Sequence, residues 1–457
     1  MFVAIGSSFG NDPSFPGGRG ASRGERVLRA PCNGRQEWGH GVDGQQGWNE
    51  CARPGSNPRV TSPHLPRPRG VQPPRPRAAL LALLLVPSIA ACSPEPATGS
   101  VLLITVGGES PELEPLGECL PGPLLAFPAA HAPTNWPLAS ARLLHGDPGA
   151  APTTVDAWFA PGPQPSEVTL AERFDAAGFR TVSIVAGPLI ASTSALEQGF
   201  AQVITAPSAL GDSLAATRDA LGVARRALGG RVFVWIHLRG AAPPGSSDST
   251  ARTREEWLRW AGEEPDRARA ELLETHRAAQ AEHRALLAEF LDELRAEEGG
   301  GPHALVTALS GFELLEAGLL GEGTTVREAG LAVPFLLFGP GVPEGKVERR
   351  VGLADVGPTL LDLAGVPLEE STRGLTVLPG SAAPERVHLA GTRRLRHADV
   401  LYDEQLKLIR DRATGAVQLY DLEQDPRESV DLHDLRGSER TRMEARLDAL
   451  LEERGQR

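Results

Sequence analysis

Short runs of consecutive apolar residues alternate with segments of helical periodicity from residue 100 onward, and this alternation limits the possible folds more than any other feature. A strand that is apolar at every position is buried on both faces, as in parallel sheets covered by helices. We therefore predict an α/β domain over residues 100–380, with a mostly parallel sheet sandwiched by helices. The predicted strands are 100–106, 180–187, 231–238, 304–309 and 333–342, and the predicted helices are 169–177, 208–228, 254–298 and 355–364.

The last part of the chain follows a different pattern. Short alternating runs are joined by turns such as 413–415, and an amphipathic segment spans about 439–452. We predict that residues 381–457 form a small antiparallel sheet followed by a helix. The predicted strands are 386–391, 399–404, 405–411 and 416–422.

A largely apolar segment lies well inside the chain. Arg75 and Arg77 precede the 14 residues 78–91, which end in small side chains just before Cys92. This run is too short to cross a bilayer and has the length of a signal-peptide core. The sequence before Cys92 resembles the lipobox of bacterial lipoproteins, which implies cleavage before the cysteine and a lipid on its thiol. The competing interpretation is a buried helix, although the flanks are Pro-rich and uncapped.

A signal peptide at this position implies that translation starts near Val71. Residues 1–70 are then a wrongly assigned or disordered extension, 71–91 is the signal peptide, and 92–99 is a tether. The mature protein would face the periplasm as an envelope lipoprotein, and Ser93 slightly favours the outer membrane.

The charge of the chain excludes one class of partner. Residues 1–91 contain 11 Arg and 5 Asp or Glu, a net charge of +6, so the remainder carries −18 in a chain whose net charge is −12. Such an acidic body repels nucleic acid. Beyond the leader only Cys92 and Cys119 remain, and we expect Cys119 to be a small core residue.

Several long segments resemble the sulfatase family of the alkaline phosphatase superfamily. VPFLLFGPGVP (333–343), VGLADVGPTLLDLAGVP (351–367) and QLKLIRDRATGAVQLYDLEQDPRESVDL (405–432) are close to typical family sequences. The resemblance covers about residue 100 to the C-terminus and implies the alkaline phosphatase-like fold. Family members hydrolyse sulfate or phosphate esters with a divalent cation, usually calcium, and with a formylglycine, Thr or Ser nucleophile. The cation offsets the repulsion between carboxylate ligands and the anionic ester.

The positions that carry this chemistry in the family hold other residues here. The metal-binding aspartate after the first strand aligns with Gly107, and Glu109 lies two residues later. The nucleophile aligns with Trp136, and Leu138 and Ser140 take the places of the family's proline and basic residue. A slip of one or two residues brings Ser140 nearer without restoring the motif.

Two further motifs have lost their polar groups. The family's metal-binding Asp and His align with Leu309 and Ser310, of which leucine cannot coordinate and serine is a weak ligand. The basic substrate-binding residues align with Glu322 and Thr324, which makes a cationic pocket neutral or acidic.

Four residues and one helical segment have two interpretations each. His237 is retained at the end of a predicted strand and is either a catalytic base or a hydrogen-bonded core histidine. Trp136 either fills the emptied pocket or stacks on a carbohydrate ring. Glu313 and its neighbour Glu316 are expected to be solvated or to cap a turn. The helical run 254–298 is expected to be a solvated pair of helices, or else a face that docks a partner.

Losses at four separated motifs, each with its frame intact, favour a sulfatase-like lipoprotein that is catalytically inactive. We expect no metal site and no cofactor, and a role in binding an unknown glycan or protein partner. The alternative is a sulfuric- or phosphoric-ester hydrolase with a rebuilt calcium site that uses Glu109, Ser140, His237 and Ser310, with Glu109 and His237 as the first candidates. That alternative requires these side chains to converge on one cavity. A relic without a selected function is the third possibility.

Overall fold

The computed structural model describes residues 99–120, 122–145, 167–186, 196–206, 213–241, 252–296, 301–369, 374–378, 388–392 and 397–453. All of them belong to one compact unit, Val86–Arg457. The predicted signal peptide and Cys92 lie outside the described residues. None of the helices in the described part is long and apolar enough to cross a membrane.

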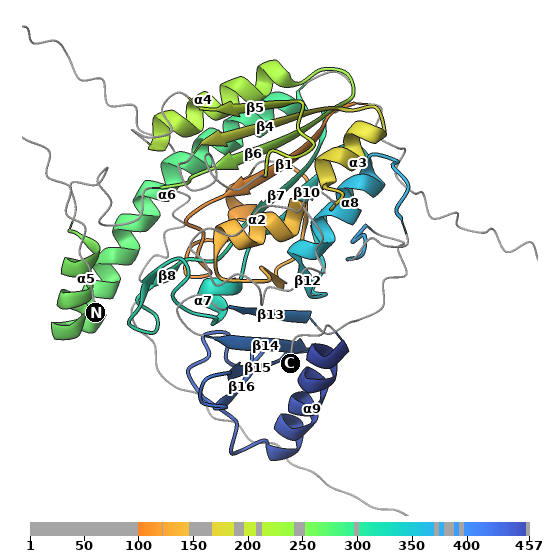
Figure 1. The fold of residues 1–457 in the computed structure, drawn as a ribbon. Helices are drawn as coiled ribbons and strands as arrows, with labels where there is room; N and C mark the ends of the chain where they lie inside the picture. Colours follow the sequence, from red (N-terminus) through yellow and green to blue (C-terminus); the bar gives the residue numbers. More distant parts are fainter. Residues whose placement is uncertain are drawn as a thin grey trace, which may run out of the picture. The chain divides into compact units, whose positions relative to one another are not determined.

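Among the described residues, an eight-stranded sheet forms the centre of the domain (Figure 1). Its strands, in spatial order, are β11 (Gly345–Lys346), β2 (Leu125–Ala126), β10 (Phe335–Phe338), β7 (His303–Ala308), β1 (Val101–Val106), β6 (Val232–Leu238), β4 (Arg180–Ala186) and β5 (Gln202–Thr205). The five strands from β7 to β5 are mutually parallel, whereas β10 runs antiparallel to both of its neighbours. This mixed, mostly parallel sheet confirms the predicted fold class.

The three central strands end at the same edge of the sheet. Thr105 of β1 is in register with His237 of β6 and with Thr307 of β7. Because these strands are parallel, the turns that follow Val106, Leu238 and Ala308 come together there. The register therefore places the predicted ligand positions of three motifs side by side.

Helices cover both faces of the sheet. Figure 1 shows one group in front of the strands and a second group, which includes the longest helix, behind them. The front group is α2 (Pro137–His145), α3 (Leu170–Ala176) and α8 (Val356–Leu363), and the second group is α4 (Ser213–Ala227) and α6 (Pro265–Arg295). A capping box begins α3, because Thr169 and Glu172 exchange side-chain-to-backbone hydrogen bonds. Gly178, with a φ of 81°, follows its end.

Smaller elements complete the domain. The predicted helical run 254–298 is divided into α5 (Arg254–Glu263) and α6, with Pro265 as the first residue of the second helix. The other short elements are α1 (Leu116–Cys119), α7 (Glu328–Leu331), the pair β3 (Ala130–His131) and β12 (Val351–Gly352), and the hairpin β8 (Glu313–Leu314) and β9 (Leu320–Gly321).

The C-terminal part forms a separate antiparallel sheet, as predicted. Its strands are β13 (His388–Thr392), β14 (Ala398–Asp403), β15 (Leu406–Asp411) and β16 (Val417–Asp421), in that spatial order, followed by α9 (Gly437–Glu453). Met443, Leu447 and Leu451 lie at helical spacing on α9 and pack into one hydrophobic cluster with Leu401 and Leu408 of the sheet.

A buried ionic cluster joins this sheet to α7. The Lys407 ammonium of β15, whose side chain is fully buried, lies 2.8 Å from Glu328 Oε1 and 2.9 Å from Glu428 Oε1. The Tyr402 hydroxyl donates a third bond, of 2.8 Å, to Glu328. Burial opposes ionisation of Glu328, but Lys407 and then Arg350 keep its pKa below the usual value. We call Glu328, Tyr402, Lys407 and Glu428 the ionic cluster.

Candidate functional site

The turn after β1 is pressed against the turn after β6. Gly107 N–H donates to Leu238 O over 2.9 Å. A Cβ atom on Gly107 would lie closer than 3.0 Å to the carbonyl oxygen of Arg239, and one on Gly240 would overlap Gly107 O in the same way. Because both obstacles are backbone atoms, an aspartate at position 107 would collide unless the turns moved apart.

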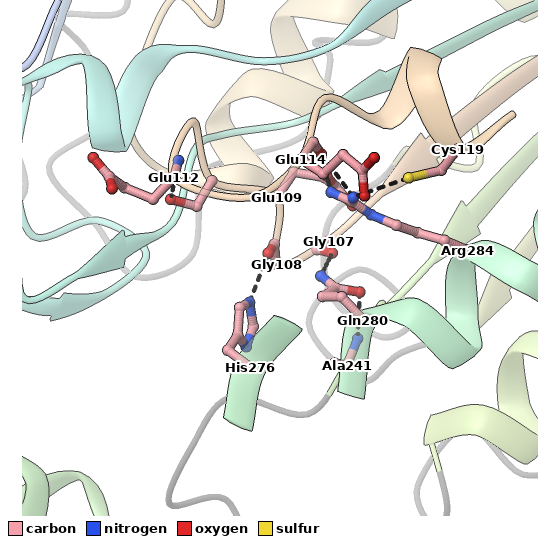
Figure 2. Close-up of polar contacts among 11 residues, drawn as sticks. Gly107, Gly108, Glu109, Glu112, Glu114, Cys119, Ala241, His276, Gln280 and Arg284 are labelled. Atoms are coloured by element: carbon pink, nitrogen blue, oxygen red, sulfur yellow. Dashed lines mark hydrogen bonds and ion pairs between the residues drawn. The ribbon is translucent and has the colours of Figure 1, made fainter. Parts of the chain in front are cut away.

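Side chains from α6 hold this turn in place. Figure 2 shows His276, Gln280 and Arg284 reaching the 107–109 turn from one side of the helix. His276 Nε2–H donates to Gly108 O over 2.8 Å, and Gln280 Nε2 donates to Gly107 O over 2.9 Å. Gln280 Oε1 also accepts from Ala241 N, so one amide joins the turns after β1 and β6. The spacing i, i+4, i+8 aligns the three residues along α6. We call them the α6 row.

Glu109 is bound by the last member of the α6 row. Its Oε2 lies 2.5 Å from Arg284 Nη2, and both side chains are buried. Burial raises the pKa of Glu109, and Arg284 offsets only part of that effect. Arg284 also donates to Glu114 O and approaches the Cys119 thiol at 3.6 Å. Cys119 is partly exposed, so the expectation that it is a core residue is wrong.

His237 is a hydrogen-bonded core histidine. Its Nδ1 lies 3.0 Å from Thr105 Oγ1, and the same hydroxyl accepts a bond from the Trp235 indole. Burial lowers the pKa of His237 to about 4, so the ring is neutral at physiological pH. Its hydroxyl partner is on an interior strand residue, which is fully buried.

The segment that aligns with the family's nucleophile is packed as core. Trp136 is 6% exposed and belongs to the main hydrophobic cluster, together with Leu138 and Leu309. Ser140 is fully buried in the first turn of α2, and its hydroxyl donates to Thr134 O over 3.1 Å. This bond occupies the serine hydroxyl within its own helix end instead of presenting it to a base.

The turn after β7 is buried as well. Leu309 is 2% exposed, and the neighbouring Ser310 hydroxyl is buried without a hydrogen-bond partner among the described residues. In the part of the chain that the structure describes, no group of three or more His, Cys, Asp or Glu side chains is placed so that it could hold a metal ion.

Glu313 and Glu316 form an acidic pair in which Glu313 is buried and Glu316 is half-buried, and sequence reasoning missed this pair. Glu313 has 0% exposure, so the expectation that it is solvated is wrong, although both carboxylates do bind the turn: Glu313 accepts from Ala317 N and Glu316 from Leu314 N. Burial raises the pKa of Glu313 to about 8, and Glu316 adds to this rise. The sequence signal for burial of Glu313 was the apolar residue on each side of it, Phe312 and Leu314.

The segment that aligns with the family's basic motif has no cationic side chain at the two positions where the family has basic residues. Glu322 and Thr324 lie on the loop after β9, and the Thr324 hydroxyl donates to Gly321 O over 2.9 Å. Glu328, four residues after Thr324, belongs to the ionic cluster, and its ion pair with Lys407 gives it a structural role.

Three of the four residues of the rebuilt-site alternative are engaged elsewhere. Glu109 contacts Arg284, Ser140 contacts Thr134 O, and His237 contacts Thr105. Within the described residues, no hydrogen bond or ion pair joins any two of these side chains or Ser310. These separate contacts do not establish the convergence that this alternative requires.

A cavity of about 770 Å³ lies between the 317–327 loop and the C-terminal sheet. Asn135, next to Trp136, and Thr324 both line it, so the cavity borders two of the degenerate motifs. Asn135 Nδ2 donates to Thr325 O over 2.8 Å, while its Oδ1 is buried and has no hydrogen-bond partner within the described part of the chain. The wall carries both signs of charge, from Arg327, Asp411, Asp431, His433, Arg440 and Glu444.

Sequence comparison links short parts of this chain to sulfatases. A search of protein-family models found no match. Human arylsulfatase K is 45% identical over 59 residues, which are 13% of this chain and 11% of that protein. The Drosophila melanogaster extracellular sulfatase SULF-1 homolog is 35% identical over 78 residues, 17% of this chain and 7% of the relative. The matches thus span only about a tenth of these relatives.

Structural comparison covers most of the chain. A 2-O GAG sulfatase superposes with a TM-score of 0.63 at 14% identity, covering 79% of this chain and 93% of its own. The phosphonate monoester hydrolase of Agrobacterium radiobacter gives a TM-score of 0.61 at 15% identity, with 78% and 96% covered. At such low identity the likeness establishes the fold, which is that of the alkaline phosphatase superfamily. The predicted resemblance to sulfatases is confirmed by both comparisons.

Proposed function

We propose that this sulfatase-like chain has no ester hydrolase activity and acts as a binding protein, anchored through Cys92 to a bacterial membrane and facing the periplasm. The observation that carries the first part is the contact between Gly107 and the Arg239 carbonyl. A metal-binding carboxylate has no room at the end of β1, where the family resemblance expects it. The burial of Trp136 and Leu309 supports the same conclusion.

The 770 Å³ cavity supports a role in binding an uncharged glycan. Its volume lies within the range of ligand sites, roughly 300–1,000 Å³. Hydroxyl and amide side chains that can pair with sugar hydroxyls line it, from Asn135, Thr324, Thr325, Thr414 and Gln418. The lining has three carboxylates against two arginines, which gives an anionic sulfate no particular advantage.

Calorimetric titration with calcium, and then with manganese and zinc, tests the loss of the metal site. The chain from residue 93 onward contains all described residues and is the sample, with a sulfatase that retains its ligands as the positive control. We expect no saturable heat from any of the three ions. Tight binding of one ion per chain would overturn the proposal and favour the hydrolase with a rebuilt site.

A glycan array tests the proposed ligand class. Gln418→Ala removes a half-exposed amide from the cavity wall, whereas Gln424→Ala removes an exposed amide outside it. A sugar that binds this cavity should lose several-fold in affinity in the first variant and nothing in the second, because one neutral hydrogen bond contributes roughly 0.5–1.5 kcal/mol. Equal affinities in the two variants, or no bound glycan, would contradict the assignment.

Mass spectrometry of native membranes tests the anchor. We expect a lipidated peptide that begins at Cys92 and no peptide from residues 1–70. An unmodified Cys92 inside a longer peptide would remove the anchor, and any peptide from 1–70 would show that translation starts upstream of Val71.

A further inference from the structure

A second cavity, of about 470 Å³, lies beside the Glu109 turn. It is enclosed by the segment 109–118, by the region around β2 and by the strands β10 and β11, and it shares no lining residue with the larger cavity. Its volume also falls in the range of small-molecule sites, roughly 300–1,000 Å³. Nothing in the proposed glycan-binding role uses this space.

The wall of this cavity is mostly apolar. Aliphatic and aromatic side chains line it, and four prolines, which have no N–H group, add to the apolar surface. The leucine and phenylalanine residues of the lining are Leu113, Leu116, Leu124, Phe127, Phe335 and Leu336. An apolar ligand body would therefore exchange water for hydrocarbon on most sides.

The polar groups at the cavity are mainly carboxylates. Glu109 lines it from within, and the exposed Glu114, Glu118 and Glu344 stand at its rim. The single lining cation, Lys346, lies 3.8 Å from Glu118. An approaching amine would meet more negative than positive charge at this opening.

Glu109 is the buried carboxylate of this cavity. Its side chain is more than nine-tenths buried, and only Oε2 contacts Arg284. No hydrogen bond to its Oε1 is found among the described residues. Burial raises the pKa of Glu109 despite the arginine, so the carboxylate is incompletely compensated where it stands. A second positive charge would stabilise its ionised form.

We propose that the 470 Å³ cavity binds a small amphiphilic amine, with its apolar body against Phe127 and Leu336 and its ammonium group among Glu109 and the rim carboxylates. A hydrocarbon chain alone satisfies the walls, whereas an acid of the same length places its charge against Glu109. The proposed ligand class therefore follows from the combination of apolar walls and acidic groups.

Three probes with one eight-carbon chain test this assignment on the full chain at pH 7. They are n-octylamine, n-octanol and octanoate, measured by isothermal titration calorimetry. We expect octylamine to bind about tenfold more tightly than octanol, since hydrogen bonds to charged groups exceed neutral ones, and octanoate to bind least. Octylamine affinity no higher than that of octanol, or a preference for octanoate, would overturn the proposal.

Two variants separate the apolar and charged contributions. Leu124→Trp fills the half-exposed side of the cavity and should abolish binding of both octylamine and octanol. The double variant Glu114→Gln/Glu344→Gln changes only exposed side chains and should lower octylamine affinity about tenfold while leaving octanol unchanged.

The matched control is Glu348→Gln/Glu423→Gln, which removes two exposed charges outside the cavity. It should leave octylamine binding within about twofold of the unmodified protein, because exposed charges farther away are screened by salt. A loss in this control equal to that of the rim variant would mean that net charge, not the cavity, attracts the amine. Retained octylamine binding in a folded Leu124→Trp variant would also overturn the assignment.

Discussion

The ionic cluster and the strand-end turns are both buried and both polar, yet they are satisfied to different degrees. Lys407 contacts two carboxylates, and Tyr402 adds a hydrogen bond to one of them. At the strand ends, the Ser310 hydroxyl is buried without a hydrogen-bond partner among the described residues, and Glu313 and Glu316 hydrogen-bond to each other as two acids. An unpaired buried hydroxyl and a pair of adjacent acids cost free energy, so these turns gain less from their polar contacts than the ionic cluster does.

The two regions also differ in the segments that they connect. The ionic cluster ties the C-terminal sheet to α7 with contacts made entirely within the chain. The turns after β1 and β6 are instead joined through Gln280 of α6. Substitutions in the two regions should therefore change the free energy of unfolding by different amounts and respond differently to calcium and pH.

The largest effect is expected from breaking the ionic cluster. Lys407→Met would remove the one cation that contacts both Glu328 and Glu428, and Arg350 would act on Glu328 alone. We expect a loss of about 3–5 kcal/mol in the free energy of unfolding, measured by urea denaturation at pH 7. The control is Lys346→Met, because that ammonium is 63% exposed and should contribute less than about 0.5 kcal/mol. A Lys407 variant as stable as its control would show that the two glutamates do not need the charge.

Gly107→Asp tests whether the metal-binding carboxylate can be restored. The new side chain collides with the Arg239 backbone, so we expect a loss of about 1–3 kcal/mol and no rise in melting temperature with calcium. Gly437→Asp is the matched control, because a Cβ atom there meets nothing within 4 Å. A Gly107→Asp protein that melts at a higher temperature with calcium would show that the turns open and accept the ion.

The sequence predicted the strands of the sheet but not the side-chain contacts at the edge where the strands end. A run such as 101–106 reveals its burial through composition alone, and the structure buries all six residues. The α6 row was hidden in a charged helical segment because the partners of Gln280 lie 173 and 39 residues away. The sequence shows that position 107 is a glycine and has no metal-binding side chain. Only the position of the Arg239 carbonyl explains why a larger side chain has no space there.

The acidic pair at the strand ends should make stability depend on pH. The pKa of Glu313 is raised from 4.5 to about 8 in the folded protein, so the folded state binds this proton more tightly than the unfolded state. Its contribution is fully present below about pH 4.5 and is lost as the pH rises through about 8. Glu313→Gln should therefore gain at least about 1.4 kcal/mol relative to the unmodified protein between pH 5 and pH 8.5, the free energy of one pKa unit.

Urea denaturation at the two pH values measures this gain. Glu289→Gln, an exposed change on α6, is the control and should show no difference between them. A Glu313→Gln variant whose stability parallels that of the unmodified protein at both values would mean that Glu313 is ionised in the folded state at pH 5 already.

The smallest effect is expected at two capping boxes of the same Thr-x-x-Glu type, one at a buried position and one at the surface. Thr169 caps α3, is 1% exposed and also donates to Gln198 O, whereas Thr253 caps the exposed start of α5. Thr169→Ala should cost about 1–2 kcal/mol, because it removes the cap and leaves the Gln198 carbonyl with one bond fewer in a buried place. Thr253→Ala should cost only about 0.5 kcal/mol, since water can replace the lost cap. Equal losses in the free energy of unfolding, measured by urea denaturation, would mean that the cap alone determines the cost of each substitution. Burial of Thr169 would then add nothing to the stability of α3.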